Sequence, residues 1–398
     1  MARGLNDQEE VAAMTRIVLG ALWIVGGIVS TAQVCCPGNF AAGSIQTGST
    51  MAKLAPQQIA QGWIMLFDGE SKFGWHIPGD VKIHDGVLEW SSDQKATATC
   101  TTRLGAFEFE LEHDTIDGEA CSLEFFTGSQ SLAAGSASSG EGWQVMRGRV
   151  EPAPVTEPEA SSEISFEADR LVYKVQARIG GGPIGLRLHK DGGETIRIRK
   201  FNVRPLGLQP IFNGKDLTGW RVVASDQARS VFAVNDQGEL TVRNGPGDLQ
   251  TVDQWADFVL QLEIKTHGRH LNSGVFFRAL PGQFWSGYEA QIRNQWERDD
   301  RNRPVDFGTG GIYNRQPARR VVSNDNEWFT MTIVAAGSHL ATWVNGFQTA
   351  DFEDTRPPAN NARQGKYTGR GCISLQGHDP TTHLSFRNLR LASLPDTR

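Results

Sequence analysis

The chain has 398 residues, of which 21% are charged, and its net charge is −6. This balance lacks the basic surface that nucleic-acid-binding proteins use, so we expect no nucleic-acid partner. The length favours two or three domains. The 44 glycines and 11 tryptophans favour an all-β protein with many turns and a flat polar ligand such as a carbohydrate. The same composition also fits a β protein with a filled core and no ligand.

Residues 1–32 have the pattern of a secretory signal peptide, in which Arg16 precedes the apolar run Ile17–Val29 and small residues follow. The apolar run is short for a membrane span, so we expect export to the periplasm or cell surface. An uncleaved N-terminal anchor is the alternative, and it is the only membrane contact that we expect; Met14 is an alternative start. Residues 33–61 are rich in Ala, Gly, Ser, Thr and Gln, which predicts a flexible leader.

From residue 62 onward, short runs alternate between apolar and polar residues. Ala106–Glu112 and Thr195–Arg204 are examples, and turn residues separate such runs. Alternation of this kind is typical of strands with one buried face. Its repeated spacing predicts an all-β sandwich or jelly roll.

An internal repeat divides the chain into two copies. The segment WIMLFDGESKFGW at Trp63–Trp75 matches LQPIFNGKDLTGW at Leu208–Trp220. Further matches follow in the same order up to the C-terminus. We therefore expect one copy at residues 62–206 and a second at residues 207–398, with almost no linker.

The first copy lacks polar features of the second. GWQVM from Gly142 aligns with GYEAQI from Gly287, so the first copy has no counterpart of the Glu-Ala-Gln triplet. It also lacks the polar insertion Asn294–Asn326. We expect the first copy to be a degenerate scaffold, which packs against the second or binds a neighbouring sugar. The second copy is expected to hold the functional site.

Two strands are expected in the second copy, at Val275–Phe277 and Tyr288–Ile292, joined by a turn with Gly and Pro. Residues two apart in a strand share a face, so Glu289 and Gln291 point to the same side. An acid beside an amide suits the floor of a concave site for a hydroxyl-rich ligand. The alternative is that both side chains simply face water.

Several motifs of the second copy occur together and in the order of a known family. They are FNGKDLTGW (Phe212–Trp220), NSGVFFR (Asn272–Arg278), GYEAQI (Gly287–Ile292), ISLQGH (Ile373–His378) and FRNLRL (Phe386–Leu391). The second copy resembles the 3-keto-disaccharide hydrolases, also described as 3-keto-glucoside 1,2-lyase/2-hydroxyglucal hydratases. The first copy resembles a degenerate member. The resemblance implies two tandem concanavalin-like β-jelly-roll sandwiches and, often, a secreted bacterial protein.

The resemblance also implies an exported enzyme that cleaves 3-keto-glycosides. In such a sugar the C3 carbonyl makes the C2 proton acidic. A base can remove this proton, O1 can leave by β-elimination, and water can add to the resulting enone. The alternatives are a non-catalytic, lectin-like carbohydrate-binding protein of the cell envelope and, more weakly, a structural envelope protein.

Residue roles in this chemistry are hypotheses. His378 or Glu289 is the base. Arg278 stabilises the enolate oxygen, and Tyr313 protonates the leaving group. Substrate contacts are expected from Asn272, Trp285, Tyr288, Gln291, Trp296 and Gln376. The sequence assigns no cofactor, and a divalent cation held by Glu289 and His378 is an alternative. A structural role for His378 is also open, because the first copy keeps a histidine, His189, at the aligned position.

Overall fold

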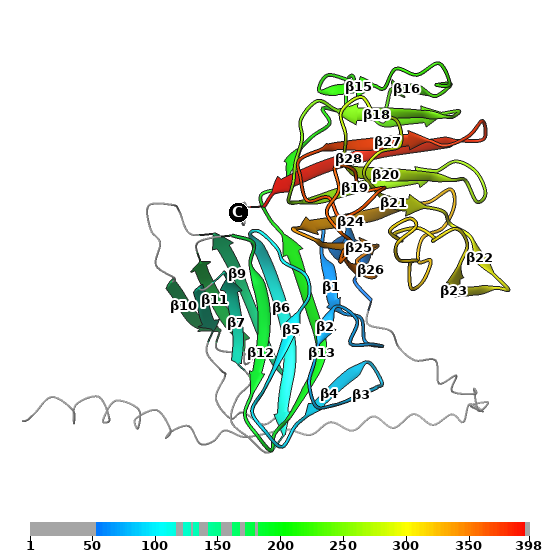
Figure 1. Cartoon of the computed structure of the whole chain (residues 1–398). Coiled ribbons are helices and arrows are strands. Elements are labelled where there is room, and N and C mark those ends of the chain that lie inside the picture. The colour runs from blue at the N-terminus through cyan, green and yellow to red at the C-terminus, as the bar shows by residue number, and fades with distance from the viewer. Residues whose placement is uncertain are drawn as a thin grey trace, which may run out of the picture. The chain divides into compact units, whose positions relative to one another are not determined.

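The structure is a computed structural model (Figure 1). It describes residues 53–116, 122–128, 130–134, 142–152, 161–167, 172–179 and 182–394. The expected signal peptide and most of the expected leader lie outside the described residues. Within these ranges, no helix is long and apolar enough to cross a membrane.

Strands make up most of the described chain. The first half contains α1 (Pro56–Ala60), β1 (Ile64–Phe67), β2 (Trp75–His76), β3 (Asp80–His84), β4 (Val87–Ser91), β5 (Ala96–Cys100), β6 (Phe107–Ile116), β7 (Ser122–Thr127), β8 (Gln130–Ala134), β9 (Gln144–Pro152), β10 (Ser161–Glu167), β11 (Val172–Ile179), β12 (Gly185–Lys190) and β13 (Thr195–Pro205). The second half contains β14 (Gln209–Pro210), β15 (Trp220–Val222), β16 (Val231–Val234), β17 (Leu240–Arg243), β18 (Gly247–Thr251), β19 (Phe258–Thr266), β20 (Ser273–Ala279), β21 (Tyr288–Ile292), β22 (Trp296–Glu297), β23 (Asp300–Pro304), β24 (Trp328–Ala336), β25 (His339–Val344), β26 (Phe347–Glu353), β27 (Cys372–Gly377) and β28 (His383–Ser393).

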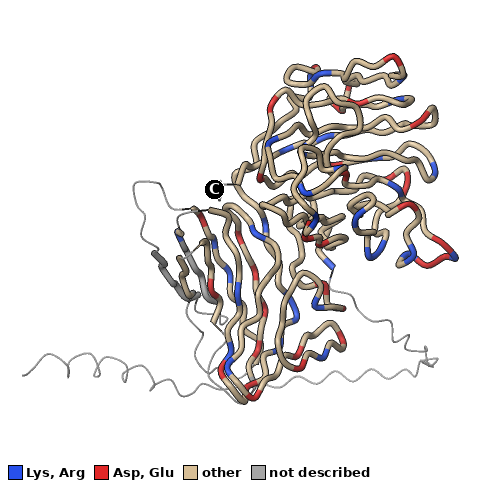
Figure 2. The backbone as a smooth tube through the Cα atoms, in the orientation of Figure 1, with Lys and Arg blue, Asp and Glu red and all other residues tan. Residues whose placement is uncertain are grey.

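Strands β1–β13 form a sandwich of two sheets. The larger sheet has the order β10-β11-β9-β6-β13-β4-β3, with β1 on β13, and the smaller has the order β2-β5-β12-β7-β8. Phe107 and Phe109 of β6 pack on Phe125 of β7 across the core. The acidic residues at the alternate positions of β6 point outward, as strand alternation requires. They form ion pairs with neighbouring strands: Glu108 with Arg204, Glu110 with Arg147, Glu112 with Arg199, and Asp114 with Arg197. Acidic and basic positions therefore lie side by side on this sheet (Figure 2).

Strands β14–β28 form a second sandwich. Its larger sheet has the order β16-β17-β28-β19-β24-β25-β26, with β14 on β28. Its smaller sheet has the order β15-β18-β27-β20-β21, and β22 pairs with β23 as a separate ribbon. Phe258 of the larger sheet packs edge-on against Phe277 of the smaller, with ring centroids 6.0 Å apart. The protein is thus all-β, with two tandem jelly-roll sandwiches, as expected.

The strand orders of the two sandwiches diverge after the β7–β8 hairpin. β8 pairs with β7 in the smaller sheet, just as β21 pairs with β20. β9 pairs instead with β6 in the larger sheet, the place that β24 takes beside β19. The alignment of GWQVM with GYEAQI is therefore wrong, because the five-residue match joins strands from different sheets.

The expected leader ends earlier than the sequence indicated. Residues 56–60 form α1, which begins with a proline at its first position. Leu54 is buried and packs with Met65 and Phe347, and Ile59 lies against the same cluster. Two apolar residues in a polar stretch were too weak a pattern to reveal this contact. The last residues of the leader belong to the fold.

The larger sheet of the second sandwich is covered on both faces. One face lines its own core. The other contributes Val259, Val334 and Trp343 to the cluster that forms the core of the first sandwich. The indole N–H of Trp343 donates to the carbonyl of Met65 at 2.9 Å, and the N–H of Met65 donates to the carbonyl of Gly346 at 2.8 Å. Among the described residues, the same cluster contains no residue of the smaller sheet of the second sandwich.

Candidate functional site

The outer face of the smaller sheet carries the acid and the amide that the sequence singled out. β20 and β21 pair antiparallel, with Phe276 opposite Glu289 and Gly274 opposite Gln291. Tyr288 belongs to the core cluster. Because side chains alternate along a strand, Glu289 and Gln291 face away from the core.

Glu289 and Gln291 begin a row of polar side chains on this face, which we call the polar row. Strands β18 and β27 extend it. Asp248 lies opposite Gln376, and Gln250 lies opposite Ser374. Leu249, between the two polar residues of β18, is in the core. No pattern in the sequence pointed to Asp248, because β18 is a five-residue strand whose only strongly apolar residue is Leu249.

Surrounding segments cover this face. The side chain of Asp248 is 0% exposed and that of Glu289 is 5% exposed. The backbone N–H of Trp285 donates to Asp248 Oδ2 at 2.7 Å, and the guanidinium of Arg363 donates to Glu289 Oε2 at 2.8 Å. The backbone N–H of Tyr313 donates to the Glu289 carbonyl at 2.9 Å. The face is a buried polar site rather than a solvated surface.

Five buried polar atoms of this region have no hydrogen-bond partner within the described residues. They are Asp248 Oδ1, Asn272 Oδ1, Gln291 Oε1, Ser374 Oγ and Gln376 Oε1. Buried polar groups are nearly always hydrogen-bonded, because leaving them unpaired costs free energy. The amide oxygens of Asn272, Gln291 and Gln376 are acceptors only, and Asp248 Oδ1 accepts when its carboxyl group is ionised. A ligand rich in hydroxyl groups is what would satisfy them.

The Glu289 carboxyl occupies space that a missing side chain leaves open. A Cβ on Gly274 would lie 2.5 Å from Glu289 Oε1. Burial raises the pKa of Glu289, and the charge of Arg363 and its hydrogen bond work in the opposite direction. Arg363 also lies over the rings of Phe276 and Tyr313, at 4.9 and 5.6 Å from their centroids. Arg363 is the cation of this site, and the sequence analysis did not identify it.

Asp248 is the second carboxyl group of the site. Burial raises its pKa to about 7, and the Glu289 carboxylate adds to the rise. The N–H of Trp285 and the charge of Arg363 oppose this shift. A carboxyl group with such a pKa can both hold and release a proton at neutral pH.

His378 follows β27 at the rim of the same face. Its Nδ1 lies 2.8 Å from Asp379 Oδ2, and its Nε2 lies 3.2 Å from the side-chain nitrogen of Asn272. An amide nitrogen only donates, so Nε2 accepts and the ring proton resides on Nδ1, where it is donated to Asp379. The indole of Trp285 stacks on the imidazole, with centroids 5.9 Å apart and planes 12° apart. The structure thus brings His378, Asn272 and Trp285 together.

The loop after β23 closes another side of the site. Asp306 Oδ2 accepts hydrogen bonds from Asn272 Nδ2 at 3.0 Å and from Gln291 Nε2 at 3.1 Å. Asp306 and Phe307 have φ angles of 50° and 65°. Non-glycine residues in this region are strained and persist where their surroundings hold them, often at functional sites. The ring of Tyr313 lies 5.2 Å from that of Phe307, so the predicted Tyr313 also borders the site.

Two expected site residues lie elsewhere. Arg278 is 0% exposed, and its guanidinium donates to the carbonyls of Ala256 and Tyr367 and to Asp257 Oδ1. All of these are structural partners, so Arg278 is not placed to stabilise an enolate. Arg278 has a φ of 50° and lies in the bulge at which the register between β20 and β27 shifts. This shift turns its side chain away from the direction that strand alternation predicts.

Tyr288 is the second correction. Its ring stacks on Phe277 in the core, with centroids 5.6 Å apart. Its hydroxyl donates to Asp354 Oδ2 at 2.6 Å. The reason is the alternation itself, because Tyr288 points opposite to Glu289 and cannot contact a ligand on the outer face.

Trp296 also lies apart from the place that the hypothesis gave it. The guanidinium of Arg301 covers one face of the Trp296 ring at 4.1 Å, and no contact joins this ring to the polar row among the described residues. Within the described ranges, no group of three or more His, Cys, Asp or Glu side chains is arranged to hold a metal ion. Arg363 donates a hydrogen bond to Glu289 Oε2, so a divalent cation at Glu289 would compete with this ion pair.

Comparisons with known proteins agree with a site in the second half. Residues 207–392 match the family model described as 3-keto-alpha-glucoside-1,2-lyase-like domain. No curated protein matches the chain. A solved structure from Parabacteroides distasonis, described as a candidate glycosyl hydrolase, is similar with 21% identity and a TM-score of 0.38 over 48% of this chain and 94% of the other. A carbohydrate-binding module from Bacillus subtilis matches with 17% identity and a TM-score of 0.34 over 46% of this chain and 99% of the other.

Proposed function

We propose that the second half of the chain, whose residues 207–392 match the model of the 3-keto-alpha-glucoside-1,2-lyase-like domain, cleaves 3-keto-glycosides. The reaction is an elimination followed by a hydration. The observation that carries the proposal is the set of five unpaired buried polar atoms beside Glu289 and His378. Sugar hydroxyls are the ligand groups that satisfy such atoms.

The first step removes the C2 proton of the 3-keto sugar. The electron pair of the C–H bond forms an enolate with the C3 carbonyl. The enolate then expels O1, which leaves with a proton as the aglycone, and an enone remains. In the second step water adds its oxygen to C1 and a proton to C2, so the sum of the two steps is hydrolysis.

His378 is the base that takes the C2 proton. Its Nε2 carries a lone pair, because the ring proton lies on Nδ1 against Asp379 at 2.8 Å. The carboxylate both fixes the tautomer and stabilises the imidazolium that forms. Asn272, the present partner of Nε2, would yield this position to the sugar.

Arg363 takes the electrostatic role that the sequence assigned to Arg278. Its side chain is the cation that contacts the polar face, through Glu289. A positive charge in a site sheltered from water stabilises a developing enolate more strongly than it would in bulk water. Glu289 keeps Arg363 in place and receives sugar hydroxyls.

Asp248 is the acid for O1. Its pKa of about 7 allows it to carry a proton at neutral pH, and its Oδ1 has no partner within the described residues. Tyr313, the acid that the sequence suggested, lies at the Phe307 side of the site and remains the second candidate.

A lectin-like protein is the alternative function. Trp285 is 37% exposed and presents an aromatic ring beside the polar row, as sugar-binding sites do. Binding needs this ring and the amides but no base. The two functions therefore differ in what happens to a bound 3-keto sugar.

The test is incubation of the full chain with a 3-keto-glucoside, with and without a chelator. Ultraviolet absorbance reports the enone, and mass spectrometry reports the released aglycone. We expect turnover by the wild type and a loss of at least about 100-fold in His378→Asn, because a positioned base contributes rate factors of this order. The matched control is His189→Asn, which removes a histidine of the first sandwich whose Nε2 contacts Glu124 at 2.9 Å. Binding of unoxidised sugars, together with no turnover of several 3-keto sugars, would establish the lectin-like function instead.

Export remains part of the proposal. It depends on the signal-peptide pattern of residues 1–32. The mass of the protein recovered from the cell envelope tests it, because signal cleavage removes these residues and an anchor retains them.

A further inference from the structure

The loop of Val305–Val321 lies alongside β21 and brings side chains to the site. The N–H of Gly310 donates to the Gln291 carbonyl, and the N–H of Tyr313 donates to the Glu289 carbonyl, each at 2.9 Å. The N–H of Gln291 donates back to the loop at Gly311. The loop thus acts as an irregular edge strand, and its position sets the positions of Asp306 and Tyr313.

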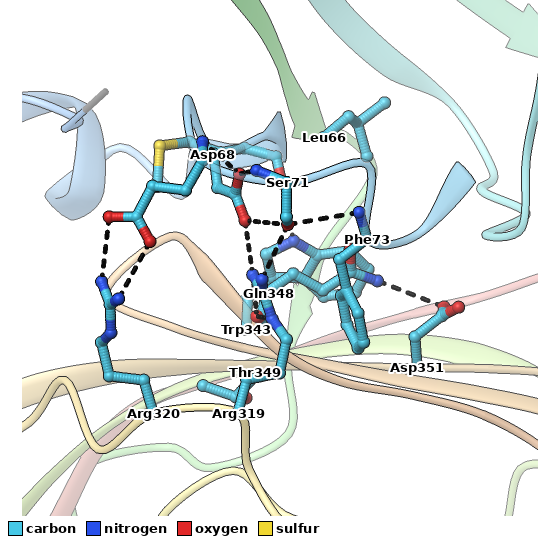
Figure 3. Close-up of polar contacts among 12 residues, drawn as sticks. Leu66, Asp68, Ser71, Phe73, Arg319, Arg320, Trp343, Gln348, Thr349 and Asp351 are labelled. Carbon is cyan, nitrogen blue, oxygen red and sulfur yellow. Dashed lines mark hydrogen bonds and ion pairs between the residues drawn. The ribbon is translucent and has the colours of Figure 1, made fainter. Parts of the chain in front are cut away.

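The C-terminal end of the same loop is bound to the first sandwich (Figure 3). Arg319 donates to Asp68 Oδ2 at 2.7 Å and to Ser71 Oγ at 2.9 Å. Arg320 donates to both carboxylate oxygens of Glu70, at 3.1 and 2.9 Å. Four residues of one turn and two of the loop therefore form the contact, which we call the latch: Asp68, Glu70, Ser71, Phe73, Arg319 and Arg320.

The Arg319 side chain is held from several directions. Its guanidinium lies between the rings of Phe73 and Phe347, at 4.2 and 4.4 Å from their centroids. It also donates to the Gln348 carbonyl. Burial works to raise the pKa of Asp68, but Arg319 and the N–H of Glu70 outweigh it, so the pKa is lowered. The ion pair is sheltered, in contrast to most surface pairs, which contribute little.

A short path leads from the latch to the site. Arg319 follows Ala318, whose N–H donates to the Phe307 carbonyl at 2.8 Å. Phe307 follows Asp306, the residue that holds Asn272 and Gln291. Asp306 and Phe307 both have positive φ angles, and a strained pair of this kind keeps its conformation only when neighbouring contacts impose it. The latch and the Ala318 bond supply these contacts.

The corresponding turn of the second sandwich has no such partner among the described residues. In the internal repeat, Asp68 and Glu70 occupy the positions of Asn213 and Lys215. Asn213 bonds only within its own exposed turn. The two acids of the first copy are therefore a specific feature of its turn and not of the shared motif.

We propose that the first sandwich positions the site loop of the second through the latch. Asp68 and Glu70 are positioning residues: they hold Arg319 and Arg320, which fix Phe307 and thereby the carboxylate of Asp306. This role gives the first sandwich a function that requires no sugar site of its own. The kinetic part of the inference rests on the proposed function, whereas the structural part does not.

Hydrogen exchange of the full chain tests the structural part without any substrate. The variant is Asp68→Asn with Glu70→Gln, which keeps side-chain size and removes both charges. We expect exchange at least about tenfold faster in the loop amides of Gly310 and Tyr313, with β19 and β24 unchanged, because local opening and global unfolding are separate processes. The matched control is Glu263→Gln, which removes a similar ion pair with Arg387 that has no link to the loop. Loop exchange equal to that of the control would overturn the proposal.

Kinetics and a second variant separate positioning from general destabilisation. We expect the double variant to raise KM about tenfold with a smaller effect on kcat, because Asp306 holds groups that bind the sugar. Arg319→Lys keeps the charge opposite Asp68 and should restore slow loop exchange in part, relative to Arg319→Ala. Equal exchange in these two variants would contradict the role of the ion pair. If the loop responds but no 3-keto sugar is turned over, the proposed function fails and the positioning role stands.

Discussion

Asp248, Glu289 and His378 differ in how the protein controls their protons. Burial raises the pKa of both carboxyl groups, whereas Asp379 and Asn272 fix the tautomer of the half-buried imidazole. The alternation of YEAQI was enough to predict the direction of Glu289. Asp248 and Arg363 could not be predicted, because their approach depends on a short strand and a distant loop that no local pattern connects.

Asp248→Asn should change the pH dependence of stability. The pKa of Asp248 is about 7 in the folded protein and 3.8 in the reference state. Between these values the unfolded chain has lost the proton and the folded protein keeps it, so wild-type stability falls as pH rises through this window. Above about pH 7, we expect the free energy of unfolding of the variant to exceed that of the wild type by up to about 4 kcal/mol. Below about pH 4, the two should differ by almost nothing. Urea unfolding across this range measures the difference, and a gain that does not vary with pH would contradict the buried carboxyl.

Comparison of Arg363→Gln with Arg278→Gln tests which of the two arginines stabilises the enolate. The guanidinium of Arg363 donates a hydrogen bond to Glu289. The guanidinium of Arg278 instead donates to two backbone carbonyls and to Asp257, which lie away from the polar row. We expect Arg363→Gln to lower kcat about 100-fold while unfolding stability changes by less than about 1–2 kcal/mol. Arg278→Gln should mainly destabilise the fold, since it leaves Asp257 without its buried partner. The opposite pattern in activity and unfolding measurements would return the catalytic role to Arg278.

At the scale of elements, the site depends on how β18, β20, β21 and β27 present one face. The strand at Tyr288–Ile292 was predicted from its alternation, and the strand at Val275–Phe277 was predicted from its short apolar run. In the sequence, the loop after β23 is part of the polar insertion Asn294–Asn326. Its pairing along β21 could not be inferred, because loop backbones find partners through tertiary structure.

Gly274→Ala tests the close approach of β20 to the Glu289 carboxyl. The added Cβ would lie 2.5 Å from Glu289 Oε1, so this side chain must move. We expect turnover or sugar affinity to fall about tenfold or more, while the unfolding free energy changes by less than about 1 kcal/mol, because alanine suits a strand at least as well as glycine. Gly268→Ala is the matched control, since its Cβ would meet only Leu271 carbons at 3.3 Å. Equal activity in both variants would mean that the position of Glu289 is unimportant.

At the scale of the whole molecule, the repeat predicted two sandwiches of one architecture. It did not predict that the larger sheet of the second is buried on both faces. Val259, Val334 and Trp343 are apolar in either case, so the sequence cannot distinguish a core from an interface. Nor did it identify Leu54 as part of the fold, since Leu54 and Ile59 alone in a polar stretch give no clear periodicity.

Residues 207–398 alone should not behave as a stable monomer. Without the first sandwich, Val259, Val334 and Trp343 become a contiguous apolar patch, and such patches promote association. We expect self-association in gel filtration and a lower melting temperature than that of the full chain. A monodisperse fragment with the melting temperature of the full protein would show that the interface contributes little.

The most direct test of the central claim is turnover of a 3-keto-glucoside in deuterium oxide, with the product analysed by mass spectrometry and NMR. Elimination followed by hydration replaces the C2 proton by one from solvent. We therefore predict one deuterium at C2 of the released sugar with the wild-type protein, and neither label nor aglycone with His378→Asn. Release of the aglycone without deuterium at C2 would contradict the elimination route and point to direct displacement at C1.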